Sequence, residues 1–272
     1  MIDRHRAQSI TQSITRIAEK LPKSVTLMEV CGTHTVNLRK HGIHSLLPSN
    51  VCLISGPGCP VCVTPTSYID NCFLLIEKHD ATVVTFGDMV KVPGTDGRSL
   101  SAYMGTGRCK IVYSPAEAIK RAEETTGPVV FLGIGFETTI PVVASVFHSV
   151  VRDGIPNLFL YPVFKTVPPA LQALLADPHR YFDGFILPGH VSVIIGENAY
   201  RFLDSDDAVP GVITGFEPID MLLGIERLLA LIESGKKRVE NHYTRAVKKD
   251  GNGKAQLLME KMIRPVDALW RG

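Results

Sequence analysis

Six cysteines, all within the first 109 residues of this 272-residue chain, are the residues best suited to carry chemistry. Two of them stand in the segment Gly56-Pro57-Gly58-Cys59-Pro60-Val61-Cys62. This C-x-x-C spacing lets the two sulfur atoms reach each other or bind one metal ion. A helix is predicted to begin just after the loop, and the N–H groups at its start favour thiolate over thiol. We therefore predict that Cys59 and Cys62 cycle between dithiol and disulfide.

Two other readings of this pair stay open from the residues alone. Cys59 and Cys62 could form half of a zinc site, with Cys31 and His34 completing the four ligands that a structural zinc ion usually needs. No second C-x-x-C pair exists in the chain to supply them. The two thiols could also be inert residues of a loop.

A second chemical signal is Glu29-Val30-Cys31-Gly32-Thr33-His34-Thr35. Cys31 follows the first predicted strand and is flanked by small polar residues, so we expect it to be accessible. A thiolate there is a soft ligand for iron, zinc or copper. His34 could act as a base, a proton donor or a second ligand. The alternative is a buried cysteine beside a hydrogen-bonded histidine.

Three further loops place polar side chains after predicted strands. Gly87-Asp88-Met89 offers a carboxylate, and Pro188-Gly189-His190 exposes a histidine. Gly135-Phe136-Glu137 places a carboxylate at a helix start, where simple capping is an equally good explanation. The remaining cysteines, Cys52, Cys72 and Cys109, are predicted to be small apolar core residues.

The elements that must position these residues form a regular alternation. Apolar, β-branched runs predict strands at Ser24–Glu29, Asn50–Ser55, Ala81–Phe86, Val129–Gly133, Leu158–Val163, Phe185–Leu187 and Val212–Thr214. Helix starts are predicted at Thr64-Pro65, Ser114-Pro115, Thr139, Pro168 and Pro218. The alternation predicts an α/β fold of two Rossmann-like units with mainly parallel sheets and strand–loop–helix repeats. The polar loops all follow strands, where ligands bind in open α/β sheets.

Length and pattern suggest how the chain divides. We expect a first α/β domain at residues 1–125 with the Cys31 and Cys59 loops. A second would span residues 126–235, carrying Glu137 and His190, with the boundary near Glu123–Pro128. Residues 236–272 read as a polar helical C-terminal segment. Gly135-Phe136-Glu137 and Gly215-Phe216-Glu217 hint at a repeated unit.

Composition narrows the class of protein. The net charge is +2, from 29 Lys and Arg against 27 Asp and Glu, which gives no electrostatic reason to expect a nucleic-acid partner. No apolar run approaches the roughly 20 residues of a membrane helix. The first residues, MIDRHRAQSI, have no apolar stretch of signal-peptide type. We therefore expect a cytoplasmic protein that binds neither nucleic acid nor membrane.

Six motifs in order resemble the HypD family, which helps build the nickel–iron hydrogenase active site. They are CGTHT at Cys31–Thr35, GPGCPVCVTP at Gly56–Pro65, FGDM at Phe86–Met89, VPG at Val92–Gly94, GFETT at Gly135–Thr139 and PGHVS at Pro188–Ser192.

The resemblance implies a scaffold on which the Fe(CN)2CO moiety is assembled, together with a HypC-type chaperone and a HypE-type cyanide donor. It implies that Cys31 is the iron-holding thiolate, with Gly32, Thr33, Thr35 and Asp88 around the bound moiety. Cys59 and Cys62 would be the redox pair, supported by His34, His190 and Glu137.

The resemblance also implies a [4Fe–4S] cluster held by C-terminal cysteines. Here no cysteine follows Cys109, so the chain departs from that pattern. Two other functions remain, an independent thiol–disulfide oxidoreductase and a structural zinc protein. The scaffold would be an accessory protein of metallocentre assembly with redox-active thiols, rather than a turnover enzyme in the usual sense.

Overall fold

The computed structural model describes residues 4–271 and divides the chain into two compact units. Unit 1 contains the chain up to Cys59 and then Thr166–Gly253. Unit 2 contains Pro60–Lys165 and the segment from Lys254 onward. The two units are therefore interleaved along the chain, and each is described by itself.

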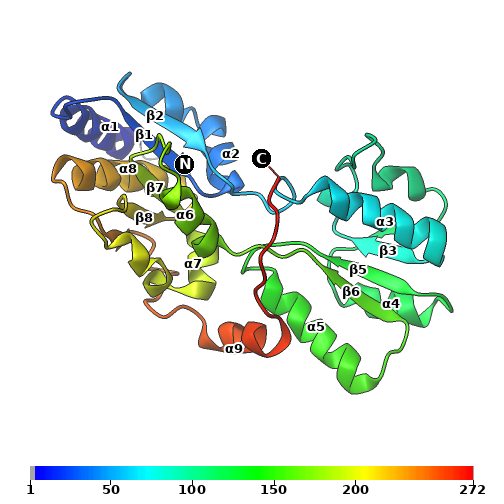
Figure 1. Ribbon diagram of the computed structural model, residues 1–272. Coiled ribbons are helices and arrows are strands. Elements are labelled where there is room, and N and C mark those ends of the chain that lie inside the picture. The colour runs from blue at the N-terminus through cyan, green and yellow to red at the C-terminus, as the bar shows by residue number, and fades with distance from the viewer. Residues whose placement is uncertain (1–3, 272) are drawn as a thin grey trace. The chain divides into compact units, whose positions relative to one another are not determined.

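Unit 1 is built on a five-stranded sheet with the order β2-β1-β7-β8-β9, in which every neighbouring pair is parallel. Its elements are α1 (Arg4–Ala18), β1 (Val25–Glu29), α2 (Gly32–Lys40), η1 (Ile43–Leu46), β2 (Val51–Ser55), α6 (Val167–Ala176), β7 (Gly184–Pro188), α7 (Gly189–Ile195), η4 (Glu197–Leu203), β8 (Gly211–Thr214), α8 (Pro218–Glu233) and β9 (Val239–Asn241). Figure 1 shows these elements in blue at the start of the chain and in green to orange after residue 165.

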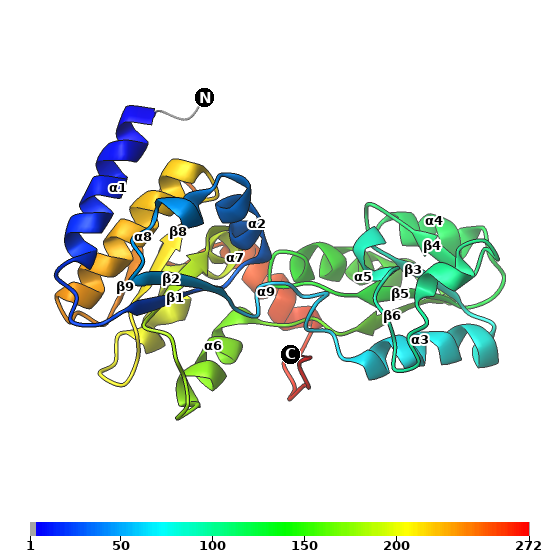
Figure 2. The same ribbon diagram turned by 90° about the horizontal axis from the view of Figure 1, so that it is seen from above.

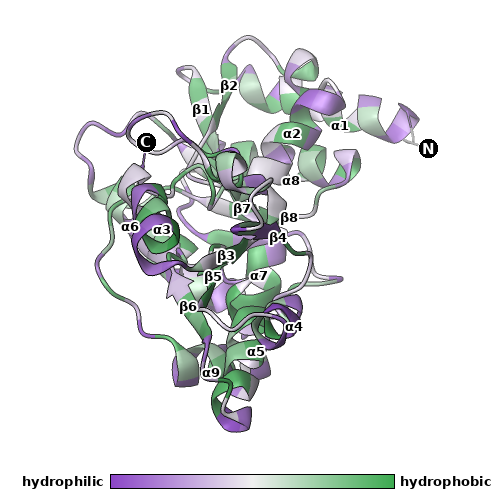
Figure 3. Ribbon diagram, turned by 90° about the vertical axis from the view of Figure 1, so that its right-hand side faces the viewer, coloured by the Kyte–Doolittle hydropathy of each residue, from purple (hydrophilic) through white to green (hydrophobic). Residues whose placement is uncertain are grey.

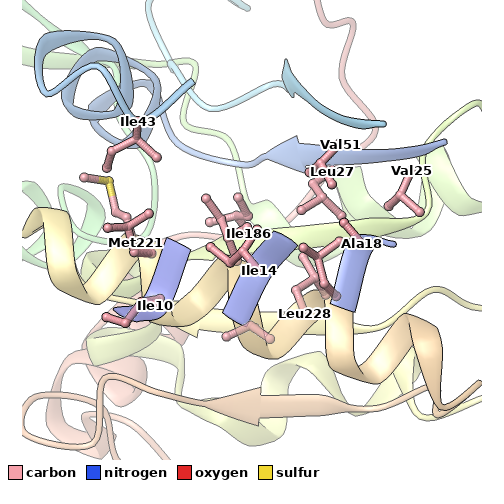
Figure 4. Close-up of a cluster of buried hydrophobic side chains, with 14 of the residues drawn as sticks. Ile10, Ile14, Ala18, Val25, Leu27, Ile43, Val51, Ile186, Met221 and Leu228 are labelled. Carbon is pink, nitrogen blue, oxygen red and sulfur yellow. The ribbon is translucent and has the colours of Figure 1, made fainter. Parts of the chain in front are cut away.

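Helices α1 and α8 lie side by side over one face of this sheet (Figure 2). Ile10, Ile14 and Ala18 recur at every fourth position of α1, so they form one buried stripe on the helix. Figure 4 shows this stripe among apolar side chains from β1, β7 and α8. The α1 helix was not among the predicted elements, because its only sequence signal is this short stripe.

Unit 2 is built on a four-stranded parallel sheet with the order β4-β3-β5-β6. Its elements are α3 (Thr66–His79), β3 (Thr82–Thr85), η2 (Gly87–Met89), η3 (Leu100–Tyr103), β4 (Cys109–Ile111), α4 (Glu117–Glu123), β5 (Val129–Gly133), α5 (Ile140–Asp153) and β6 (Leu158–Pro162). Helix α9 (Gly253–Met262) begins at the last residue of unit 1 and continues into unit 2.

Alternate residues of the strands in unit 2 feed two apolar clusters on opposite faces of the sheet. Val83 packs with residues of α3, whereas Val84 packs with residues of α4 and α5. All four residues of β3 are buried, as continuous apolar runs predict for a strand covered on both faces. In Figure 3, hydrophobic residues follow the strands and hydrophilic residues gather on parts of the helices.

The predicted α/β fold with parallel sheets is confirmed, and each of the seven predicted strands is present. The division of the chain differs from the expected one. The expected boundary at residues 125 and 126 falls inside unit 2, between α4 and β5. Residues 236–272 contribute a strand, β9, to unit 1 as well as the expected helix. Periodicity identifies a strand but does not say which sheet it joins.

Within residues 4–271, no helix combines the length and apolarity needed to cross a bilayer.

Candidate functional site

Cys31 occupies the turn between β1 and α2, at the carboxyl end of a central strand of unit 1. It is the N-cap residue of α2, with extended backbone angles of φ −159° and ψ 124°. The side chain is buried, with a relative exposure of 2%. The prediction that Cys31 is accessible is therefore wrong, and the reason is a contact with a distant loop.

That loop is Gly56–Cys59, whose backbone packs directly against Cys31. Gly32 donates its N–H to the carbonyl oxygen of Gly58 at 3.0 Å. A Cβ on Gly58 would lie 2.4 Å from both N and Cα of Cys31, so only glycine allows this approach. The contact also brings Cys59 to Cys31, because a Cβ on Gly32 would stand 3.7 Å from the Cβ of Cys59.

Two opposing effects act on the Cys31 thiol. Burial raises its pKa, while the main-chain N–H groups of His34 and Thr33 lower it. These two groups belong to the first turn of α2, where unpaired N–H groups stabilise negative charge. Burial is the larger effect, so the pKa of Cys31 is raised and its side chain is a thiol near pH 7. The two N–H groups would stabilise the negative charge of a thiolate at this position.

His34 lies in the first turn of α2 and is fully buried. Its Nε2 lies 3.0 Å from the carbonyl oxygen of Gly215, so Nε2 carries the proton and donates it. The ring stacks on Phe216 with centroids 4.6 Å apart. Burial lowers the pKa of His34 to about 4, so the ring is neutral near pH 7. Its Nδ1 has no hydrogen-bond partner within the described part of the chain.

His190 approaches Cys31 from the neighbouring strand, because it follows β7 as Cys31 follows β1. Its Nδ1 lies 3.9 Å from the Sγ of Cys31, a distance suited to a weak hydrogen bond with sulfur. The ring contacts Phe216 at a centroid distance of 5.3 Å, and burial lowers the pKa of His190. The structure thus brings together Cys31, His34 and His190, three residues that the sequence singled out.

Two aromatic residues of this site were missed by the sequence analysis. Phe216 holds both histidine rings, and Tyr243 meets Phe216 edge-on with centroids 6.4 Å apart. Tyr243 lies 2.7 Å from where a Cβ would stand on Gly189 and on Gly215, so both glycines are needed there. The repeated Gly-Phe-Glu motif was a usable signal for Phe216, whereas nothing in the polar segment marked Tyr243.

The threonines of the Cys31 loop have different surroundings. Thr33 is exposed and Thr35 is half-buried. Thr35 Oγ1 lies 3.4 Å from both the carbonyl oxygen of Cys31 and the Oγ of Ser55. Thr35 also lowers the pKa of Glu29, which burial raises. Thr35 therefore ties the first turn of α2 to the ends of β1 and β2.

The C-x-x-C pair falls where the chain passes from unit 1 to unit 2, since Cys59 ends one unit and Pro60 begins the other. Cys59 is half-buried and Cys62 is exposed. Helix α3 starts at Thr66, four residues after Cys62. Cys59 lies close to the start of α2, next to Gly32.

Two of the predicted site residues belong to unit 2. Asp88 is exposed in η2. Glu137 is buried, with a relative exposure of 2%, in the loop between β5 and α5. Nearby in the sequence, Phe136 stacks on Trp270 with centroids 6.3 Å apart. The buried ammonium of Lys165 donates to the carbonyl oxygen of Leu269 at 2.7 Å.

The three cysteines assigned to the core behave differently from one another. Cys72 and Cys109 are buried, and burial raises their pKa values to about 12 and about 11. The prediction is wrong for Cys52, which is exposed. Cys52 lies on β2, the edge strand of its sheet, where one face is open to solvent.

No three His, Cys, Asp or Glu side chains among residues 4–271 are grouped so that they could hold a metal ion between them.

Known proteins with similar sequences identify the family of this chain. The HypD family model, described as the hydrogenase formation hypA family, matches residues 5–272. Hydrogenase maturation factor HypD of Escherichia coli is 39% identical over 285 aligned positions, which cover 100% of this chain and 75% of that protein. HypD of Rhizobium leguminosarum bv. viciae is 37% identical, covering 98% of this chain and 71% of the relative. The hydrogenase expression/formation protein HupD of Azotobacter chroococcum is 40% identical, covering 90% and 67%. The chain belongs to the HypD family of hydrogenase maturation factors.

Proposed function

We propose that this chain holds an iron ion through the Cys31 thiolate while the Fe(CN)2CO moiety of a nickel–iron hydrogenase is assembled. The observation that carries this proposal is the setting of Cys31 Sγ. It stands at the start of α2, 3.9 Å from Nδ1 of His190 and beside Cys59. Iron with carbonyl and cyanide ligands is a soft centre, for which a thiolate is a fitting anchor.

The buried setting of Cys31 suits cargo that must be kept and then released. A cation displaces the thiol proton when it binds, so binding and deprotonation are one event. The N–H groups of Thr33 and His34 then stabilise the sulfur charge that remains. Exclusion of water strengthens these interactions, because the local dielectric constant is low.

His190 and His34 are proposed to position the thiolate rather than to bind iron. His190 offers Nδ1 to the sulfur, and Phe216 holds its ring from the side. His34 donates its Nε2–H to the carbonyl oxygen of Gly215, and its ring stacks on the same phenyl ring. Phe216 therefore fixes the spacing between the helix that carries Cys31 and the strand end that carries His190.

Cys59 and Cys62 are proposed to supply electrons during assembly. Closing their disulfide releases two electrons and two protons, which would be taken up when the bond between the donor protein and the cyanide group is cleaved reductively, so that the cyanide itself is not reduced. Cys59, next to Cys31, would be the sulfur nearer the cargo. Glu137 and Asp88 remain proposed members of the site, together with Gly32, Thr33 and Thr35.

The other iron ligands are proposed to come from outside this chain. They would be the cyanide and carbonyl groups themselves and a HypC-type chaperone, with a HypE-type protein as cyanide donor. No cysteine follows Cys109 in the sequence, whereas the resemblance implies a [4Fe–4S] cluster held by C-terminal cysteines. No step of the proposal uses such a cluster.

The test is metal analysis after anaerobic purification with a HypC-type partner. The proposal expects bound iron with infrared bands of cyanide and carbonyl, lost in Cys31→Ser. Cys52→Ser is the matched control, because it removes an exposed cysteine from the same unit. A metal-free protein with a reducible Cys59–Cys62 disulfide would instead favour an oxidoreductase. One tightly bound zinc ion would favour the structural zinc protein.

A further inference from the structure

A cavity of about 500 Å³ opens in unit 1 at the edge of the sheet opposite Cys31. Its walls come from residues 23–26, 180–183, 208–210 and 231–237. The first three segments lead directly into β1, β7 and β8, so the cavity lies at the amino ends of these parallel strands. Cys31, His190 and Phe216 follow the carboxyl ends of the same strands. The cavity is therefore separate from the proposed iron site.

The cavity is lined by four cationic side chains, Lys23, Arg180, Lys236 and Lys237, against one carboxylate, Asp183. That carboxylate is already engaged, since Oδ1 accepts from Lys23 at 2.8 Å and Oδ2 accepts from the N–H of Thr26 at 2.9 Å. The residues that line the cavity therefore carry more positive than negative charge.

The neighbouring aspartates do not remove this excess. Asp206 and Asp207 meet Lys237 and Arg180 through main-chain carbonyl oxygens, and neither residue lines the cavity. The ammonium of Lys236 has no hydrogen bond or ion pair with any residue that the structure describes.

Lys236 and Lys237 are not needed to end helix α8. The chain turns at Gly235, whose φ is +65°. Its N–H bonds to the carbonyl oxygen of Ile232 at 3.1 Å, and the N–H of Lys236 bonds to that of Leu231 at 2.9 Å. Ser234 Oγ donates to the carbonyl oxygen of Ala230 at 2.8 Å. The last carbonyl groups are thus satisfied without either lysine side chain.

The cavity also has an apolar part suited to an organic ligand. Phe182 is buried in the wall, Tyr181 is exposed at the rim, and Pro210 and Ile232 complete the apolar surface. A volume of this size falls within the range of small-molecule sites, roughly 300–1,000 Å³. Lysine and arginine together form the donor set that phosphate groups favour.

We propose that this cavity binds a small organic phosphate, with its phosphate groups among Lys23, Arg180, Lys236 and Lys237 and its apolar body against Tyr181. The proposal does not depend on the iron scaffold, because the two sites lie at opposite edges of the sheet. Binding there would couple the stability of unit 1 to the supply of such a ligand.

The test is calorimetric titration of the full chain with adenosine 5′-diphosphate, pyrophosphate and adenosine at constant ionic strength. Saturable binding of the diphosphate is expected, with pyrophosphate weaker and adenosine weakest. The double variant Lys236→Gln/Lys237→Gln should weaken diphosphate binding by about tenfold or more, since the loss of a single charge-assisted hydrogen bond already costs about tenfold. The matched control is Lys248→Gln/Lys249→Gln, another exposed lysine pair of unit 1, which should leave binding unchanged.

Three outcomes overturn the proposal. One is the absence of saturable binding by any of the three probes at millimolar concentration. Another is an equal loss in both double variants, which would indicate unspecific attraction to surface charge. The third is binding of pyrophosphate without any gain from the nucleoside, which would remove the organic body. Thermal unfolding of both variants establishes that each is folded.

Discussion

Replacing Gly58 by alanine tests the contact on which the setting of Cys31 depends. The new Cβ would lie 2.4 Å from two backbone atoms of Cys31, whereas ordinary contacts begin at 3.4 Å. The difference of about 1 Å must be met by moving backbone against backbone, because no flexible side chain can yield. The Gly56–Cys59 loop should therefore lift away from Cys31.

The expected cost follows from two parts. Overpacking of this kind costs about 1–3 kcal/mol. Loss of the bond from Gly32 N–H to Gly58, now 3.0 Å long, adds about 1 kcal/mol. Gly58→Ala should thus lower the free energy of unfolding of unit 1 by about 2–4 kcal/mol. It should also expose Cys31, which is now 2% exposed.

Both effects can be measured without any partner protein. Urea unfolding followed by circular dichroism gives the stability, and maleimide labelling with mass mapping gives the accessibility of Cys31. Gly253→Ala is the control, because it lies in the same unit with nothing within 4 Å of its new Cβ. If Gly58→Ala stays within about 0.5 kcal/mol of the unchanged protein and Cys31 stays protected, the close approach is not what buries the thiol.

Three further predictions concern Cys31, the buried cysteines and His34. Cys31→Ser should keep or slightly raise stability in thermal unfolding, because serine is a better N-cap than cysteine; a clear loss would contradict the assigned cap. Cys109→Ser should cost about 1–3 kcal/mol in urea unfolding, since the serine hydroxyl would be buried where residues 4–271 offer the Cys109 side chain no hydrogen-bond partner. Cys72→Ser should cost less than Cys109→Ser, because the carbonyl oxygen of Tyr68 accepts from Cys72 Sγ at 3.2 Å and can accept from a serine hydroxyl in the same way. Equal costs for the two variants would show that this hydrogen bond does not matter. His34 has a folded-state pKa of about 4, below its ordinary 6.5, so protons favour the unfolded chain and stability should fall as pH drops from about 6.5 toward 4. His34→Gln should flatten this decline in urea unfolding at stepped pH, and an unchanged slope would show that His34 does not cause it.

The strands could be predicted because each is a continuous apolar run, which a parallel sheet covered on both faces requires. The same reasoning failed for Cys52, whose run looks alike in sequence but forms the edge strand β2. Position within a sheet is a property of the whole fold and leaves little trace in a short run. The interleaving of the two units along the chain could not be predicted either, because a short apolar run does not indicate which sheet its strand joins.

The candidate site shows a similar division between local and distant signals. Cys31, His34 and His190 were recognisable from residue type and from their place after strands. The burial of Cys31 was not, since it depends on Gly58, which is 27 positions further along the chain. Tyr243 was missed because an aromatic residue in a polar segment carries no local sign that it packs against Phe216.

The interleaved chain also imposes an order on the formation of the structure during synthesis. Residues 60–165, which make the whole sheet of unit 2, leave the ribosome before β7 can pair with β1. The sheet of unit 1 cannot be completed at that point, because only β1 and β2 have been synthesised. It needs β7 and β8, and the Cys31 site also needs Phe216, which follows β8. The nascent chain therefore carries Cys31 and Cys59 as unprotected thiols for the time it takes to add more than 100 residues. A reducing environment, or a protein that covers these thiols, would prevent them from forming premature disulfides at that stage.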